Sequence, residues 1–166
     1  MVKNKAAKPH YEKAKTSVCW DIDNCPIPKG CKAEGVAQKI ISALHKLNYR
    51  GQVSIFAFGN MNHIPPFVKQ ALSSTGITLE HVNFGPERGE VRKRLYDDVM
   101  FWGFDNPPPA NIMFICRDEE TRSHNQEMER GYNILLMQSQ IKFNMLILIL
   151  VNLVMIQIRN KTITES

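Results

Sequence analysis

The chain has 166 residues, of which 43% are hydrophobic and 22% are charged. This composition is ordinary for one globular domain with its own core, and it excludes a mini-protein that depends on disulfides or a structural metal. The net charge of +5 is uneven, because residues 1–16 hold five lysines and one glutamate and so account for +4. The high pI therefore does not predict a basic binding face. Residues 1–16 also lack an apolar period, so we expect a disordered, solvated tail rather than a nucleic-acid-binding one.

The four cysteines form no C-x-x-C pair; they are Cys19, Cys25, Cys31 and Cys116. Their spacing matches no common zinc site. The N-terminal residues also lack the apolar stretch of a secretory signal. We therefore expect reduced, structural thiols in an intracellular protein, with the cytoplasm as its location.

Strands and helices are predicted to alternate along the chain. Apolar runs typical of strands lie at about 18–22, 52–58, 77–82, 111–116 and 132–137. Apolar residues at helical spacing, or polar segments between breakers, predict helices at about 33–47, 66–75, 91–104 and 120–130. This order is typical of an α/β protein, with a central, mostly parallel sheet of about five strands between two layers of helices.

Two acids and an amide stand at the end of the first predicted strand: Asp21, Asp23 and Asn24. Carboxylates are rarely placed in a buried strand without a partner, because removing them from water costs several kcal/mol. Such a group at a strand end indicates a bound cation or a catalytic role. The alternative is that these acids cap helices or lie on the surface.

Further acids are predicted to reach the same place. Ligands of parallel sheets bind at the carboxyl ends of strands, where the strand order reverses. If the first and fourth strands are neighbours there, Asp21 faces Asp118 and Glu120, and Asp98 approaches from the preceding helix. Converging carboxylates favour Mg²⁺ or Mn²⁺, and such sites hydrolyse phosphodiesters. Asp118 and Glu120 precede a predicted helix, however, and helix capping is a competing explanation for them.

Four segments resemble the NYN domain, which belongs to the PIN-like nuclease group. They are WDIDNCPIPKG, AFGN, LYDDVMFWGFDNPPPANIMFIC and RGYNILLMQ, within residues 17–138. They look most like plant members related to the meiosis regulator and mRNA stability factor (limkain-type) proteins. The resemblance implies a PIN-like fold and a metal-dependent endoribonuclease that acts on single-stranded RNA, in RNA turnover or regulation of gene expression. A peroxisomal association is implied by this resemblance alone.

Carried over position by position, the resemblance implies roles for six residues. Asp21, Asp98 and Asp118 would be catalytic and hold Mg²⁺ or Mn²⁺, with Asp23, Asn24 and Glu120 in support. Basic residues near this site are candidates for contacts with RNA phosphates, although each alone is typical of a solvated surface: Lys29, Lys32, Arg88, Arg92, Lys93, Arg94 and Arg117.

The segment after the fourth strand departs from the family pattern. Cys116-Arg117 stands where the family has Ser-Gly, Thr121 where it has Phe, and Asn60 where many relatives have Asp. Arg117 would place a cation beside the metal site, where it weakens metal binding or holds a phosphate. A second hypothesis is therefore a catalytically degenerate NYN domain that binds RNA or a protein partner without cleavage.

The C-terminal residues 139–166 differ in composition from the rest. Residues 143–158 are mostly Ile, Leu, Val and Met, with Asn144, Asn152 and Gln157 as the polar exceptions. A membrane span needs about 20 apolar residues, so we do not expect a membrane partner. A sixth strand, a buried helix, a weak anchor and an unnatural end from a misread gene boundary stay open. The composition favours an aberrant or loosely packed tail.

Overall fold

The computed structural model describes residues 6–82, 90–116 and 131–138, and it contains one five-stranded parallel sheet. The strands are β1 (Thr16–Asp21), β2 (Val53–Gly59), β3 (Ile77–His81), β4 (Ala110–Cys116) and β5 (Tyr132–Gln138). Their order in the sheet is β3-β2-β1-β4-β5, and every neighbouring pair is parallel. The predicted α/β fold with a parallel sheet of five strands is therefore confirmed.

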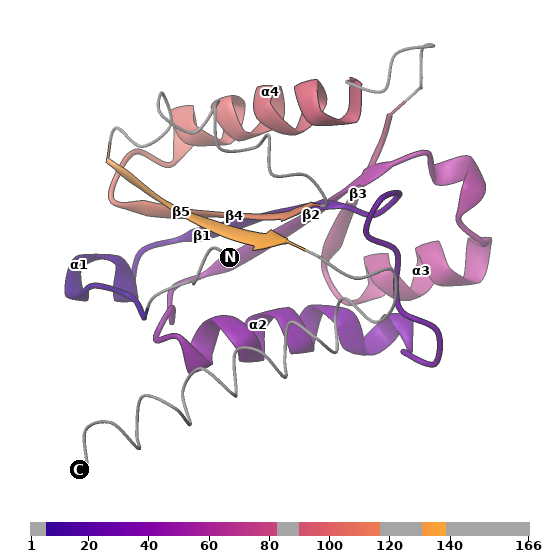
Figure 1. The fold of residues 1–166 in the computed structure, drawn as a ribbon, viewed down its shortest axis with the longest axis horizontal. Helices are drawn as coiled ribbons and strands as arrows, with labels where there is room; N and C mark the ends of the chain where they lie inside the picture. The colour runs from indigo at the N-terminus through magenta and orange to yellow at the C-terminus, as the bar shows by residue number, and fades with distance from the viewer. Residues whose placement is uncertain (1–5, 83–89, 117–130, 139–166) are drawn as a thin grey trace.

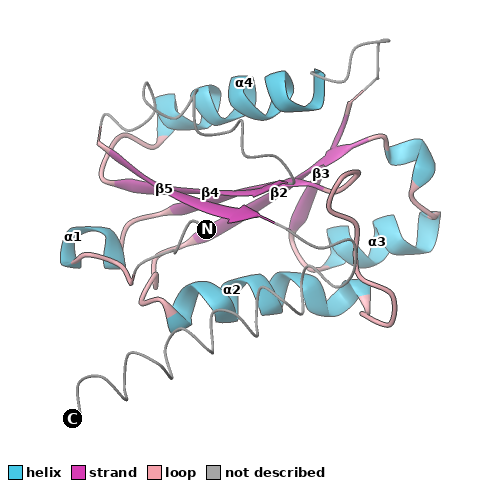
Figure 2. Ribbon diagram, viewed as in Figure 1, coloured by secondary structure: helices cyan, strands magenta, loops and turns pink. Residues whose placement is uncertain are grey.

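Helices cover both faces of the sheet, as Figures 1 and 2 show. The helical elements are α1 (Pro9–Glu12), η1 (Ala33–Gly35), α2 (Val36–Lys46), η2 (Met61–His63), α3 (Pro66–Ser74) and α4 (Glu90–Asp105). α2 and α3 pack on one face and α4 on the other. Each of the two faces thus has its own apolar core, which explains why β1 and β4 are buried along their whole length.

Two helix ends carry residue types that are common at such positions. Asn48 follows α2 in the left-handed conformation, with φ of 64°, and Pro66 occupies the first turn of α3. The predicted helix at 33–47 differs at its start, because Ala33–Gly35 forms a separate 3₁₀ turn. The helix predicted at 120–130 and the tail 139–166 lie outside the described residues. None of the helices in the described ranges has the length and apolar content needed to cross a bilayer.

Part of the segment predicted to be disordered is ordered in the structure. Among the described residues 6–16, α1 forms one helical turn, and the Ala7 N–H donates to the Leu47 carbonyl at 2.8 Å. The Asn111 side chain, fully buried in β4, donates to the carbonyls of Tyr11 and Ala14 at 3.1 and 3.3 Å. These contacts come from residues far away in the sequence, so local composition could not reveal them.

Asn111 also joins the amino-terminal ends of three strands. Its amide reaches the Thr16 hydroxyl in β1 at 3.2 Å, and its carbonyl accepts from Asn133 in β5 at 2.9 Å. Asn133 in turn donates to the Tyr49 hydroxyl at 3.1 Å. A buried amide with all its partners satisfied stabilises the fold, whereas its removal leaves several groups unpaired.

We predict that Asn111→Ala lowers the free energy of unfolding by about 3 kcal/mol, because it orphans buried carbonyl and amide groups. Urea denaturation followed by circular dichroism measures this change. Asn62→Ala, at an exposed position, is the matched control and should change stability by less than about 0.5 kcal/mol. Equal stability of the two variants would contradict the role assigned to Asn111.

Candidate active site

The candidate site lies at the carboxyl end of β1, the central strand. β1 pairs with β2 on one side and β4 on the other, so the strand order reverses between β1 and β4. The β1–β4 register ends with Trp20 opposite Ile115, and Asp21 and Cys116 come next in their strands. The predicted adjacency of the first and fourth strands is confirmed. Asp21 therefore occupies the position where parallel sheets bind their ligands.

Asp21 is a buried carboxylate, 7% exposed, with hydrogen-bond donors in the turn that follows it. The backbone N–H of Asn24 donates to Oδ1 at 3.0 Å, and the Asn24 side-chain amide donates to Oδ2 at 2.7 Å. Burial raises the pKa of Asp21 above its ordinary value; the two Asn24 hydrogen bonds oppose this shift, and the charge of Asp23 adds to it. The carboxylate is thus fixed in orientation, and within the described residues it has no ion-pair partner, as expected for a cation ligand.

The turn after β1 is fixed by contacts of its own. The Trp20 indole N–H donates to the Cys25 carbonyl at 2.7 Å, and the Cys25 N–H donates to the Asp21 carbonyl at 2.9 Å. Asp23 accepts a hydrogen bond from the backbone N–H of Asn60 at 2.7 Å, which ties this turn to the end of β2. Asn24 and Asp23 therefore hold the turn that carries Asp21 in place.

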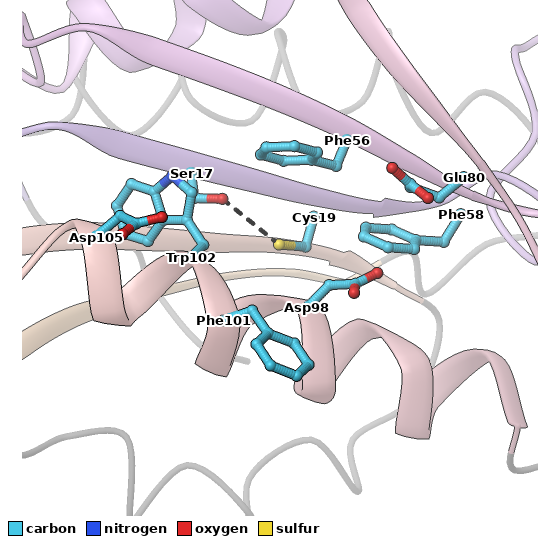
Figure 3. Close-up of a pocket in the computed structure, with 9 residues that line it drawn as sticks. All are labelled: Ser17, Cys19, Phe56, Phe58, Glu80, Asp98, Phe101, Trp102 and Asp105. Atoms are coloured by element: carbon cyan, nitrogen blue, oxygen red, sulfur yellow. Dashed lines mark hydrogen bonds between the residues drawn. The ribbon is translucent and has the colours of Figure 1, made fainter.

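Asp98 faces the sheet from α4, while its neighbour Asp97 is exposed. Its carboxylate lies beside Phe58 and Cys19 in a cavity of about 250 Å³ between α4 and the sheet, which Figure 3 shows. The cation paired with Asp98 is Arg94, whose Nε lies 2.9 Å from Oδ2. Burial, with a smaller contribution from the charge of Asp98, raises the pKa of the Cys19 thiol to about 12. Asp21 does not line this cavity.

Only some of the other predicted site residues lie in the described ranges. Lys29, Lys32 and Lys93 are exposed, and Arg94 approaches Glu80 at 3.9 Å in addition to Asp98. Arg92 lies in the first turn of α4. The other predicted residues lie outside the described ranges: Arg88, Arg117, Asp118 and Glu120.

The described residues supply part of an oxygen-ligand site. They contain no cluster of three or more acidic, histidine or cysteine side chains able to hold a metal. They do contain Asp21, whose buried carboxylate is the hard oxygen ligand that Mg²⁺ and Mn²⁺ prefer. The donor chemistry of Asp21 thus fits a divalent cation. Asp118, two positions beyond the end of β4, is the candidate for the opposite side.

Sequence reasoning missed the role of Gly59 and of the Asn60 backbone. An added Cβ on Gly59 would lie 2.8 Å from Cγ of Asp23 and 2.8 Å from a methyl carbon of Ile22. These distances are too short for carbon atoms, so only glycine lets β2 approach the turn this closely. A glycine at the end of a predicted strand was a signal for such an approach.

We predict that Gly59→Ala destabilises the protein by about 2 kcal/mol, since the new methyl group displaces Asp23 or β2. Thermal unfolding followed by circular dichroism tests this. Gly35→Ala is the matched control, because its Cβ would meet only the flexible Lys39 side chain, at 4.0 Å. If both variants melted at the same temperature, the close approach at Gly59 would not constrain the turn.

Comparison with known families agrees with this geometry. The model of the NYN domain matches residues 15–147, which is most of the chain. A search of curated proteins finds no matching relative. The five-stranded parallel sheet with its helices is consistent with the PIN-like α/β fold of this family. The chain therefore belongs to the NYN domain family, a family of PIN-like nucleases that generally use divalent metals.

Proposed function

We propose that this protein is a divalent-metal-dependent endoribonuclease that cleaves single-stranded RNA. The observation that carries the proposal is the buried Asp21 carboxylate at the point where the strand order reverses. A charge in this position costs stability unless a cation compensates it. Membership of a nuclease family supplies the reaction class.

In this proposal, Asp21 and Asp118 hold Mg²⁺ or Mn²⁺ from the ends of β1 and β4, and Glu120 supports them. The bound metal would activate water and stabilise the charge that develops on the phosphodiester. Asn24 keeps both Asp21 oxygens in a fixed direction through its two hydrogen bonds. Asp23 holds the turn in place through the Asn60 N–H.

Asp98 is the third proposed ligand, and Arg94 competes for it. The Arg94–Asp98 ion pair at 2.9 Å would have to open before Asp98 could bind a metal. Release of Arg94 would also free a cation for RNA. RNA contacts are further proposed for the other basic residues around the site: Lys29, Lys32, Arg88, Arg92, Lys93 and Arg117.

We place the protein beside the plant limkain-type members of the family, in RNA turnover or regulation of gene expression. The support is the joint order of the four matching segments named above. The cytoplasm is the proposed location, with a peroxisomal association following from the same resemblance.

A second candidate function is RNA or protein binding without cleavage. It is favoured by two cations: Arg117, where the family has glycine, and Arg94, which already neutralises Asp98. Both would oppose a divalent ion at this site. This candidate retains the fold and the RNA partner but not the reaction.

The nuclease proposal predicts that Asp21→Asn lowers the rate of RNA cleavage in Mg²⁺ roughly 100-fold or more, because a neutral amide holds a divalent ion poorly. The assay follows a labelled single-stranded RNA on a gel. Asp97→Asn, an exposed acid on α4, is the matched control and should keep its activity. Equal rates for Asp21→Asn and the unaltered protein would refute the proposal. RNA binding by folded protein without cleavage or Mg²⁺ binding would instead support the second candidate.

A second prediction concerns stability and pH. Because the folded state raises the pKa of Asp21, the ionised carboxylate destabilises the native state above its ordinary pKa, and the penalty disappears at lower pH as it is protonated in both states. Without metal, Asp21→Asn should therefore melt above the unaltered protein at about pH 8, and the difference should shrink toward about pH 4.

Adding Mg²⁺ should raise the melting temperature of the unaltered protein and leave that of Asp21→Asn unchanged, because a ligand stabilises only the state that binds it. Scanning fluorimetry with and without the metal measures both effects. An equal shift in both proteins would show that the metal binds away from Asp21.

A further inference from the structure

The cavity under α4 adjoins the proposed nuclease site. Ser17 and Cys19 form its floor, and Asp21 follows them on the same face of β1, because strand side chains alternate between the two faces. Asp98, a proposed metal ligand, lines it from α4. Its volume of about 250 Å³ is smaller than the roughly 300–1,000 Å³ of pockets for drug-sized ligands, so it has room for one small ring system. An RNA bound at the metal ligands therefore has beside it a cavity that fits a single base.

Aromatic rings line this cavity, and several of them are only partly covered. Phe56 on β2 and Trp102 on α4 are half-buried, and Phe101 is 68% exposed. Phe104, 78% exposed, lies next to Phe101, with ring centroids 6.4 Å apart. Proteins bind single-stranded RNA by stacking its unpaired bases on such rings. Rings beside the metal ligands are thus suited to hold bases of the strand that is cleaved.

The two ends of the cavity differ in charge. At one end, Glu80 and Asp98 already have Arg94 beside them, at 3.9 and 2.9 Å. Asp105 lies at the opposite end, as Figure 3 shows, and it has no ion-pair partner in the described part of the chain. A carboxylate without a cation repels phosphate groups. What it binds in RNA is an uncharged base edge that carries hydrogen-bond donors.

A buried hydroxyl on the floor adds an independent polar group. Ser17 is 1% exposed, and within the described residues its hydroxyl finds only the Cys19 sulfur, at 3.8 Å. This is a weak hydrogen bond, because sulfur is a poor acceptor and the thiol a weak donor. A buried hydroxyl so poorly satisfied gains from an incoming polar group. The occupant is therefore polar at its edge as well as flat.

From these observations we infer that the cavity binds one guanine base of the RNA substrate, an inference that rests on the proposed function. Among the four bases, guanine alone carries two adjacent donors on its Watson–Crick edge, N1–H and the C2 amino group, and these match the two oxygens of one carboxylate. Adenine and cytosine place a ring-nitrogen acceptor beside their amino group, and uracil has a carbonyl on each side of its N3–H. An ionised carboxylate only accepts hydrogen bonds, so it disfavours these acceptors. Asp105 thus determines the base preference, and Phe101 stacks on the base.

The test measures RNA binding in EDTA, so that no metal-dependent cleavage takes place. The probe is a fluorescein-labelled oligouridine of about eight nucleotides with one central guanine, and fluorescence anisotropy follows its binding to the full chain. Inosine in place of guanine lacks the C2 amino group and should weaken binding roughly fivefold. Asp105→Ala should bind the two RNAs equally. Asp97→Ala, which removes an exposed acid of α4 that does not line the cavity, is the matched control and should keep the preference.

Stacking is tested with a second pair of variants. Phe101→Ala should weaken binding of the guanine RNA roughly fivefold, because it removes a stacking surface. Phe67→Ala removes a ring that is 73% exposed on α3, across the sheet from α4, and should leave binding unchanged. Circular dichroism confirms that each variant is folded.

Any of four results would overturn this inference: no saturable binding of the guanine RNA, equal binding of the guanine and inosine RNAs by the unaltered protein, a preference that Asp105→Ala retains, or equal binding by Phe101→Ala and Phe67→Ala. The proposed nuclease function is judged separately. Cleavage in Mg²⁺ that depends on Asp21 but shows no guanine preference would refute this inference alone. Guanine-selective binding that Asp105→Ala abolishes, without cleavage, would support this inference and refute the nuclease proposal.

Discussion

The burial of one carboxylate, that of Asp21, governs the arrangement of the carboxyl end of the sheet. Because β1 lies between β2 and β4, its last residue is shielded on both sides, and the charge there must be held by hydrogen bonds. Asn24 provides two of these from within the same turn, and the Asp23 backbone contributes to them. The tight contact between Gly59 and Asp23 then keeps that turn against β2. These contacts together fix the direction of the two Asp21 carboxylate oxygens.

α4 covers the face of the sheet on which the cavity lies, and Ser17 and Cys19 of β1 form the floor of that cavity. Strand side chains alternate between the two faces, so Asp21 lies on the same face of β1 as these two residues. Acids and aromatic rings line the cavity, and exposed phenylalanines lie beside it on α4. Arg94 pairs with Asp98 and approaches Glu80, so these two acids already have a cation of the chain beside them.

Much of the fold was predictable because strands and helices with strong apolar periods alternate along the chain, and Asp21 was recognisable as an acid in an apolar strand. The order of residues 6–16 was not, since it depends on the Asn111 amide about 100 residues away. Nor could the sequence show that Asp98 pairs with Arg94 and lines a cavity under α4. Helical spacing predicts which side chain turns inward but not which partner it meets there.

The central place of β1 also bears on how the chain folds. β1 precedes the other strands in the chain, and β2 can cover one of its edges after a short helical crossover. Its other edge pairs with residues 111–115, so it has no partner until nearly a hundred further residues have been made. Contacts this distant slow folding and leave an apolar strand edge open to aggregation in the meantime. The edge of β1 that pairs with β4 is accordingly completed late in synthesis on the ribosome.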